Sequence, residues 1–76
     1  MSDGELVRRA RNGCNTALAE LVNRWSGKVL AFCHVHLRRP EVAADLAQDA
    51  LLRSIKQLHT LQHPDRYGPW LRSIAH

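Results

Sequence analysis

The chain has 76 residues and a formal net charge of +4 at pH 7, with 24% charged and 5% aromatic residues. This length allows one small domain with a thin core, and no apolar run is long enough to span a membrane. Its two cysteines, Cys14 and Cys33, are too few for a disulfide framework and are typical of a reducing compartment. The first residues have neither the charge nor the apolar stretch of a signal peptide, so we expect a cytoplasmic protein.

The charges are distributed unevenly along the chain. Carboxylates cluster at the N-terminus and between Glu41 and Asp49, whereas the stretch 56–76 holds one acid, Asp65, among several lysines, arginines and histidines. A surplus of cations favours polyanions such as nucleic acids. A basic end and a separate acidic patch therefore indicate two different partners.

Helical spacing of apolar residues and the absence of alternating segments predict an all-α fold, a compact bundle of about four helices. The predicted helices span about residues 3–12, 16–38, 40–59 and 69–76.

Capping signals mark the ends of these helices. Ser2 and Glu5 form a capping-box pattern, and Gly13 is suited to a C-terminal stop. Asn15 is a predicted N-cap for the second helix, and Pro40 suits the first turn of the third.

Each helix presents an apolar face at about 100° per residue. On the first helix, Arg8, Arg9 and Arg11 are predicted to form a solvated face. The predicted core stripe of the second helix contains Leu18, Leu21, Val22, Trp25, Val29, Phe32, Cys33 and His36. The stripe of the third contains Ala43, Ala47, Ala50, Leu51, Ser54, Ile55 and Leu58. The fourth helix, opened by Pro69, contributes Trp70, Leu71 and Ile74.

The histidines and cysteines do not form a recognisable metal site. His59 and His63 have helical spacing, but Pro64 pushes the residue before it away from helical geometry. Cys33 and His36 lie on the core stripe, where a satisfied buried pair is the better interpretation. Because no CxxC or HExxH pattern occurs, the sequence predicts neither a metal nor a cofactor.

Catalysis is also not indicated. No glycine-rich phosphate loop or nucleophile motif is present. Asp45 and Asp49 could pair as acid and base, but an exposed helix face without a pocket is not suited to acid–base catalysis. We therefore predict that the chain is not an enzyme.

The polar face of the third helix carries an unexpected leucine. Asp45, Gln48, Asp49 and Leu52 stand at i, i+3, i+4 and i+7, so they form one strip. The strip has two interpretations. One is a solvated acidic face with an exposed leucine, and the other is a docking surface for a partner helix that bears arginines.

Two motifs carry a resemblance to a known family. The run DLAQDALLRSIKQL (45–58), followed after a short loop by PWLRSIA (69–75), resembles region 2 of the extracytoplasmic-function (ECF) class of bacterial RNA polymerase sigma factors. The segment ELVRRARNGCNTALAELVNRW (5–25) is similar in spacing to the opening pair of helices of that family. The resemblance covers nearly the whole chain.

The resemblance implies that the strip docks on RNA polymerase. In the family, the corresponding positions bind the arginine-rich clamp helices of the polymerase β′ subunit. Asp45, Gln48 and Asp49 would then accept hydrogen bonds, and Leu52 would be the apolar anchor. An anti-sigma factor is a further partner that the resemblance makes plausible.

The resemblance also implies binding of promoter DNA. In the family, the loop before the fourth helix and the face of that helix hold the melted non-template strand of the minus-ten element, with a flipped base in the loop. The residues that would do so here are Lys56, His59, Leu61, Gln62, His63, Arg66, Tyr67 and Arg72. The three lysine or arginine side chains are the expected phosphate contacts, and Leu61, Gln62, His63 and Tyr67 the expected base or pocket contacts. For Tyr67 and Trp70, core packing is the alternative.

The sequence also departs from the family pattern and leaves alternatives open. Leu61 stands where an aromatic is frequent and Ile55 where tryptophan is common, so the promoter preference does not follow from the resemblance. We expect the natural chain to continue into a helix-turn-helix domain that reads the minus-thirty-five element. The alternatives are a small helical interaction or dimerisation module without DNA binding, and a generic double-stranded DNA binder.

Overall fold

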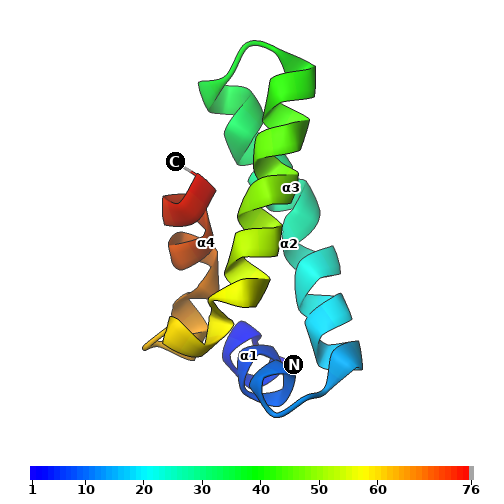
Figure 1. Ribbon diagram of the computed structural model, residues 1–76, viewed down its shortest axis with the longest axis vertical. Helices are drawn as coiled ribbons and strands as arrows, with labels where there is room; N and C mark the ends of the chain where they lie inside the picture. The colour runs from blue at the N-terminus through cyan, green and yellow to red at the C-terminus, as the bar shows by residue number, and fades with distance from the viewer. Residues whose placement is uncertain (76) are drawn as a thin grey trace.

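The computed structural model describes residues 1–75, and all of their regular structure is helical. The elements in order are α1 (Asp3–Arg11), α2 (Asn15–His36), α3 (Pro40–Lys56), the 3-10 turns η1 (Leu58–Thr60) and η2 (Pro64–Arg66), and α4 (Tyr67–Ala75). Figure 1 shows α2 and α3 as a long antiparallel hairpin, with α1 at its open end and α4 alongside α3. The predicted all-α bundle of four helices is confirmed.

The first helix begins and stops where its capping residues predict. The backbone amide of Glu5 donates to Ser2 Oγ at 3.2 Å, which satisfies one of the free donors of the first turn. Gly13, just after the helix, has a φ of 92°, a left-handed conformation that glycine adopts without steric cost.

Other predicted helix ends were wrong by one to three residues. Asn15 is the first residue of α2 rather than its cap, because Cys14 occupies the extended N-cap position. α2 ends at His36 rather than 38, since the chain must become extended before Pro40. α3 ends at Lys56, after which i→i+3 hydrogen bonds replace the helical ones in η1.

The fourth helix also starts earlier than predicted. α4 begins at Tyr67, two residues before Pro69. Proline is tolerated there because the first amides of a helix have no acceptor inside it. The predicted end of this helix at residue 76 lies outside the described residues.

The core is formed by the predicted stripes of α2 and α3 with contributions from every other helix. From α2, Leu21, Trp25, Val29 and Cys33 are buried, and from α3 the three alanines of the predicted stripe, Leu51 and Ser54 are buried. The predicted buried pair of Cys33 and His36 is wrong. His36 is exposed in the last turn of α2, where its ring lies 4.6 Å from that of Phe32.

A buried hydrogen bond joins α3 to α4. Ser54 and Tyr67 are 0% and 1% exposed, and their hydroxyl oxygens are 2.9 Å apart. Because Ser54 Oγ donates to the carbonyl of Leu51 at 2.7 Å, Tyr67 is the donor to Ser54. Burial raises the pKa of the Tyr67 phenol above its ordinary value.

A close contact also brings α4 onto α2. A Cβ at Gly68 would collide with the indole of Trp25, so only glycine allows the first turn of α4 to lie on that ring. The Trp25 ring is also edge-on to Tyr67, with centroids 6.2 Å apart. Both contacts therefore hold Trp25 of α2 against the first turn of α4.

Replacing Tyr67 with phenylalanine should remove the buried hydrogen bond and keep the ring. We expect the free energy of unfolding to fall by about 0.5–1.5 kcal/mol near neutral pH, measured by urea denaturation. Since the folded pKa of the phenol is raised, the stability that the phenol contributes is complete below the unfolded value of about 10 and is lost as the pH rises through the folded value. The difference between the two proteins should therefore shrink above pH ~10. A difference that stays constant there would contradict this assignment.

Candidate functional site

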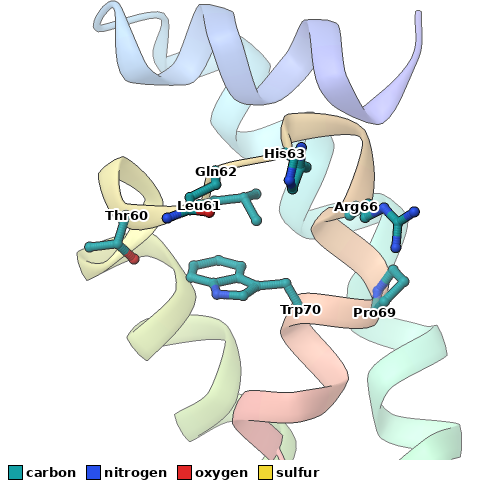
Figure 2. Close-up of a pocket in the computed structure, with 7 residues that line it drawn as sticks. All are labelled: Thr60, Leu61, Gln62, His63, Arg66, Pro69 and Trp70. Carbon is teal, nitrogen blue, oxygen red and sulfur yellow. The ribbon is translucent and has the colours of Figure 1, made fainter.

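A hollow of about 450 Å³ lies between the loop before α4 and the first turn of α4. Its lining consists of Thr60, Leu61, Gln62, His63, Arg66, Pro69 and Trp70. Figure 2 shows the loop residues above the indole of Trp70, with Arg66 and Pro69 at one side. The hollow thus offers an aromatic face, an apolar wall, hydrogen-bonding side chains and one cation. Such a set suits a flat ring attached to an anionic group.

Four of the eight predicted DNA-contacting residues line this hollow. Gln62, His63 and Arg66 are exposed there. Leu61 is only 6% exposed, and its side chain forms part of the wall. The structure therefore gathers the residues at the centre of the predicted loop at one place.

The other four predicted contacts do not line the hollow. Tyr67 is buried with its hydroxyl bonded to Ser54, so the structure corrects its predicted base contact and agrees with core packing. Lys56 is exposed at the end of α3, and His59 lines a different hollow. Arg72 is exposed on α4, with its guanidinium 5.9 Å from the centroid of the Trp25 ring.

Sequence reasoning missed several lining residues. Thr60 and Pro69 carried no signal beyond their place in the loop motif. Trp70 is half-buried, and its ring centroid lies 6.1 Å from that of Tyr67, so it packs on the core and also faces the hollow.

The loop is held in place by Arg11 of α1. Its guanidinium donates to the carbonyl of Leu58 at 3.0 Å and 2.8 Å, and also to the carbonyl of Leu61. Leu58 begins η1 and Leu61 follows its last residue, so the guanidinium bridges the two ends of this 3-10 turn. Arg8, Arg9 and Arg11 are all exposed, as the predicted solvated face requires, but Arg11 also has partners 47 or more residues away in the chain, which the sequence pattern did not predict.

The other end of the loop also rests on α1. A Cβ at Gly4 would collide with the carboxylate of Asp65 in η2, so η2 and the first turn of α1 are in close contact. A carboxylate near the N-terminus of a helix is favoured by the helix dipole. α1 thus contacts both ends of the loop that forms the hollow.

The strip predicted on α3 forms one exposed surface. Asp45, Gln48, Asp49 and Leu52 are all exposed, and Leu52 is 51% exposed while the adjacent Leu51 is 8% exposed. One oxygen of Asp49 forms a salt bridge with Arg53 Nε at 2.9 Å, which leaves the second oxygen for a donor from elsewhere. The strip faces away from the core and combines acceptors with an apolar side chain.

Two further findings concern the described residues alone. Within residues 1–75, no group of three or more His, Cys, Asp and Glu side chains could hold a metal ion. No helix in this range combines the length and apolar character needed to cross a membrane.

Comparison with known proteins identifies the family to which this chain belongs. A family model described as sigma-70 region 2 matches residues 21–76. The chain belongs to the sigma-70 region 2 family. The resemblance to region 2 of ECF sigma factors is confirmed, and α1 lies before the matched part of the chain.

Two curated relatives extend this similarity into α1. A probable RNA polymerase sigma factor RfaY of Xanthomonas campestris pv. campestris is 34% identical over 66 residues, which cover 87% of this chain and 16% of the relative. The ECF RNA polymerase sigma factor SigW of Bacillus subtilis is 25% identical over 69 residues, which cover 91% of this chain and 37% of the relative. The chain thus spans well under half of either relative. No solved structure matches it.

Replacing Arg11 with methionine should loosen the loop of this sigma-70 region 2 domain. Hydrogen bonds to a charged donor contribute about 1.5–3 kcal/mol each, so local opening should become at least roughly ten times more frequent. Amide hydrogen exchange at Thr60 and Leu61, measured by NMR, reports this opening directly. Arg8→Met, on the same helix and exposed, is the matched control and should leave both amides unchanged. Equal protection in both variants would contradict the role of Arg11.

Proposed function

We propose that the chain is the promoter-recognition domain of an ECF-type RNA polymerase sigma factor. It docks on the clamp helices of the polymerase β′ subunit through α3 and binds the melted non-template strand of the minus-ten element through the loop before α4. The observation that carries the proposal is the hollow beside Trp70, at the loop where the family resemblance places a flipped base. The relatives' names, both RNA polymerase sigma factors, support it.

The polymerase contact is supported by the exposed strip on α3. A partner helix that bears arginines would find acceptors in Asp45, Gln48 and the second oxygen of Asp49. The same helix would cover Leu52, of which 51% is exposed in the domain alone. Covering that half contributes about 1 kcal/mol, a share of the 1.5–3 kcal/mol of full burial. An anti-sigma factor that covered this strip would compete with polymerase.

The DNA contact is supported by the chemistry of the hollow. A base that stacks on an aromatic side chain gains about 1–3 kcal/mol, and Trp70 supplies such a face. Gln62 and His63 offer donors and acceptors to the edge of a base, and Arg66 offers a cation to its phosphate. Holding an unstacked base in this way keeps the strand single, so the proposed activity is binding and not catalysis.

A second candidate function is a protein-interaction or dimerisation module without DNA binding. The observation that favours it is the exposure of Leu52, which a second copy of the chain could also cover. This candidate gives no role to the hollow. Sedimentation equilibrium separates the two functions, because a tight dimer that is disrupted by Leu52→Glu supports the second one alone.

Leu52→Glu and Asp49→Arg should each abolish capture of the domain by β′ clamp helices. The first places a charge where an apolar contact forms, and the second sets like charges against the arginines of the partner. Val35→Glu is the matched control, since Val35 is 82% exposed and lies on α2 near the far turn of the hairpin. Circular dichroism checks that all three variants are folded. Capture that survives in both strip variants would refute the docking surface.

Arg66→Glu should weaken binding to a single-stranded promoter oligonucleotide at least several-fold, measured by fluorescence anisotropy at low salt. The variant replaces an attractive phosphate contact at the hollow with a repulsive one. Arg38→Glu makes the same change in charge and serves as control, because Arg38 lies between α2 and α3. That turn is at the opposite end of the α2–α3 hairpin from the loop before α4 (Figure 1). If the two variants bind equally well, the loop is not the DNA-binding face.

A further inference from the structure

We propose that Lys28 of α2 and Arg72 of α4 form a phosphate-binding site around the ring of Trp25, which extends the DNA-binding face onto α2. The inference rests on the proposed function. Its ligand is the sugar-phosphate backbone of the strand whose base enters the hollow. Lys28 was not among the predicted contacts, and no signal in its own helix marks it.

The two cations converge on one aromatic ring. Lys28 Nζ lies 4.8 Å from the centroid of the Trp25 ring, and the guanidinium carbon of Arg72 lies 5.9 Å from it. Both distances are within the range of cation–π attraction. α2 and α4 are far apart in sequence, so their packing creates this pair of charges.

The platform under the pair is rigid. Trp25 is 9% exposed and cannot shift toward α4, because its ring already touches the backbone at Gly68. Tyr67 meets it edge-on at 6.2 Å. The positions of the two cations are thus partly fixed before any ligand binds, which reduces the entropy lost on binding.

The pair carries a charge that the protein does not neutralise. In the range 1–75, no salt bridge engages Lys28 or Arg72, and both residues are exposed. Arg24, one turn before Lys28 on α2, is different, since it pairs with Asp3 at 3.0 Å and with Glu20 at 3.7 Å. Two like charges near one ring repel each other. An anion beside them attracts both cations and offsets their repulsion.

The pair continues directly from the hollow. Pro69 lines the hollow, and Arg72 follows it by three residues, about one turn further along α4. A strand that leaves the hollow beside Arg66 and follows α4 therefore reaches Arg72, and Lys28 lies over the same Trp25 ring that Arg72 approaches. A row of separate cations at an aromatic platform matches successive phosphates of one strand.

The test measures how binding of DNA depends on salt. For single strands, the logarithm of the affinity falls with the logarithm of the salt concentration with a slope of about −0.7 for each phosphate neutralised. Lys28→Gln and Arg72→Gln should each reduce the steepness of this slope by about 0.7, and the double variant by about 1.4. Arg38→Gln removes one positive charge in the turn between α2 and α3 and should leave the slope unchanged. The probes are strands of about 12 deoxyadenosines or thymidines and a fully abasic strand of equal length.

The abasic strand separates this inference from the proposed function. It keeps every phosphate and lacks every base, so the effects of Lys28→Gln and Arg72→Gln should persist on it. If these variants leave the slope unchanged on all strands, the phosphate site is refuted. This holds even if strands with bases still bind more tightly than the abasic strand, which would support the use of the hollow alone. If bases add nothing and the slope still changes, the phosphate site stands and the use of the hollow fails. Loss of binding to a polyglutamate peptide, with strand binding intact, would assign the pair to an acidic protein and overturn the inference.

Discussion

The three hydrogen bonds from the Arg11 guanidinium to the carbonyls of Leu58 and Leu61 tie the loop that lines the hollow to α1. The loop between α3 and α4 contains only two single 3-10 turns, which supply few hydrogen bonds of their own. Leu61 links the two functions of this segment. Its carbonyl is held by Arg11 on one side, and its side chain forms the wall of the hollow on the other. A mobile loop would lose conformational entropy when a ligand binds, which weakens the affinity. A loop held by α1 is already ordered, so this loss on binding is smaller.

The two sides of α3 separate packing in the core from exposed surface. Its inner side packs small residues, Ala43, Ala47 and Ala50, against the rest of the core, so the helix needs little of its circumference for stability. The outer side is then available for the strip that ends at Leu52. Because the strip lies on α3 and the hollow lies beyond its end, a partner on one surface need not cover the other (Figures 1 and 2). The proposed function needs polymerase on the strip and DNA at the hollow together, and this separation permits it.

The features that follow from local periodicity were predictable from the sequence. The stripes of α2 and α3, the exposure of Leu52 and the cap at Ser2 depend on spacing within one helix, and the structure contains them, except that His36 at the end of the α2 stripe is exposed. The features that depend on contacts between distant segments were not predictable. Arg11 has the sequence context of a solvated arginine, and only the position of η1 provides its acceptors.

The roles of the residues around Trp25 and Tyr67 also depend on contacts between distant segments, so the sequence alone did not predict them. A tyrosine in a DNA-binding loop is chemically suited to stacking on a base, and the sequence could not show that Ser54, thirteen residues earlier, takes its hydroxyl into the core. Lys28 likewise shows no pattern on α2 alone. Its significance arises when Gly68 lets α4 approach Trp25 and brings Arg72 to the same ring.

α1 contacts the loop that lines the hollow, but it lies before the part of the chain that the family model matches. The match to the sigma-70 region 2 family begins at residue 21, whereas Gly4 and Arg11 belong to the preceding helix. The residues that line the hollow therefore lie inside the family match, and the residues that hold its loop lie outside it. In a domain with a thin core, a loop that relied on its own turns would open often, since stability is lowest where buried contacts are few. The two contacts from α1 hold both ends of this loop, so the shape of the hollow depends on this helix as well as on the loop itself.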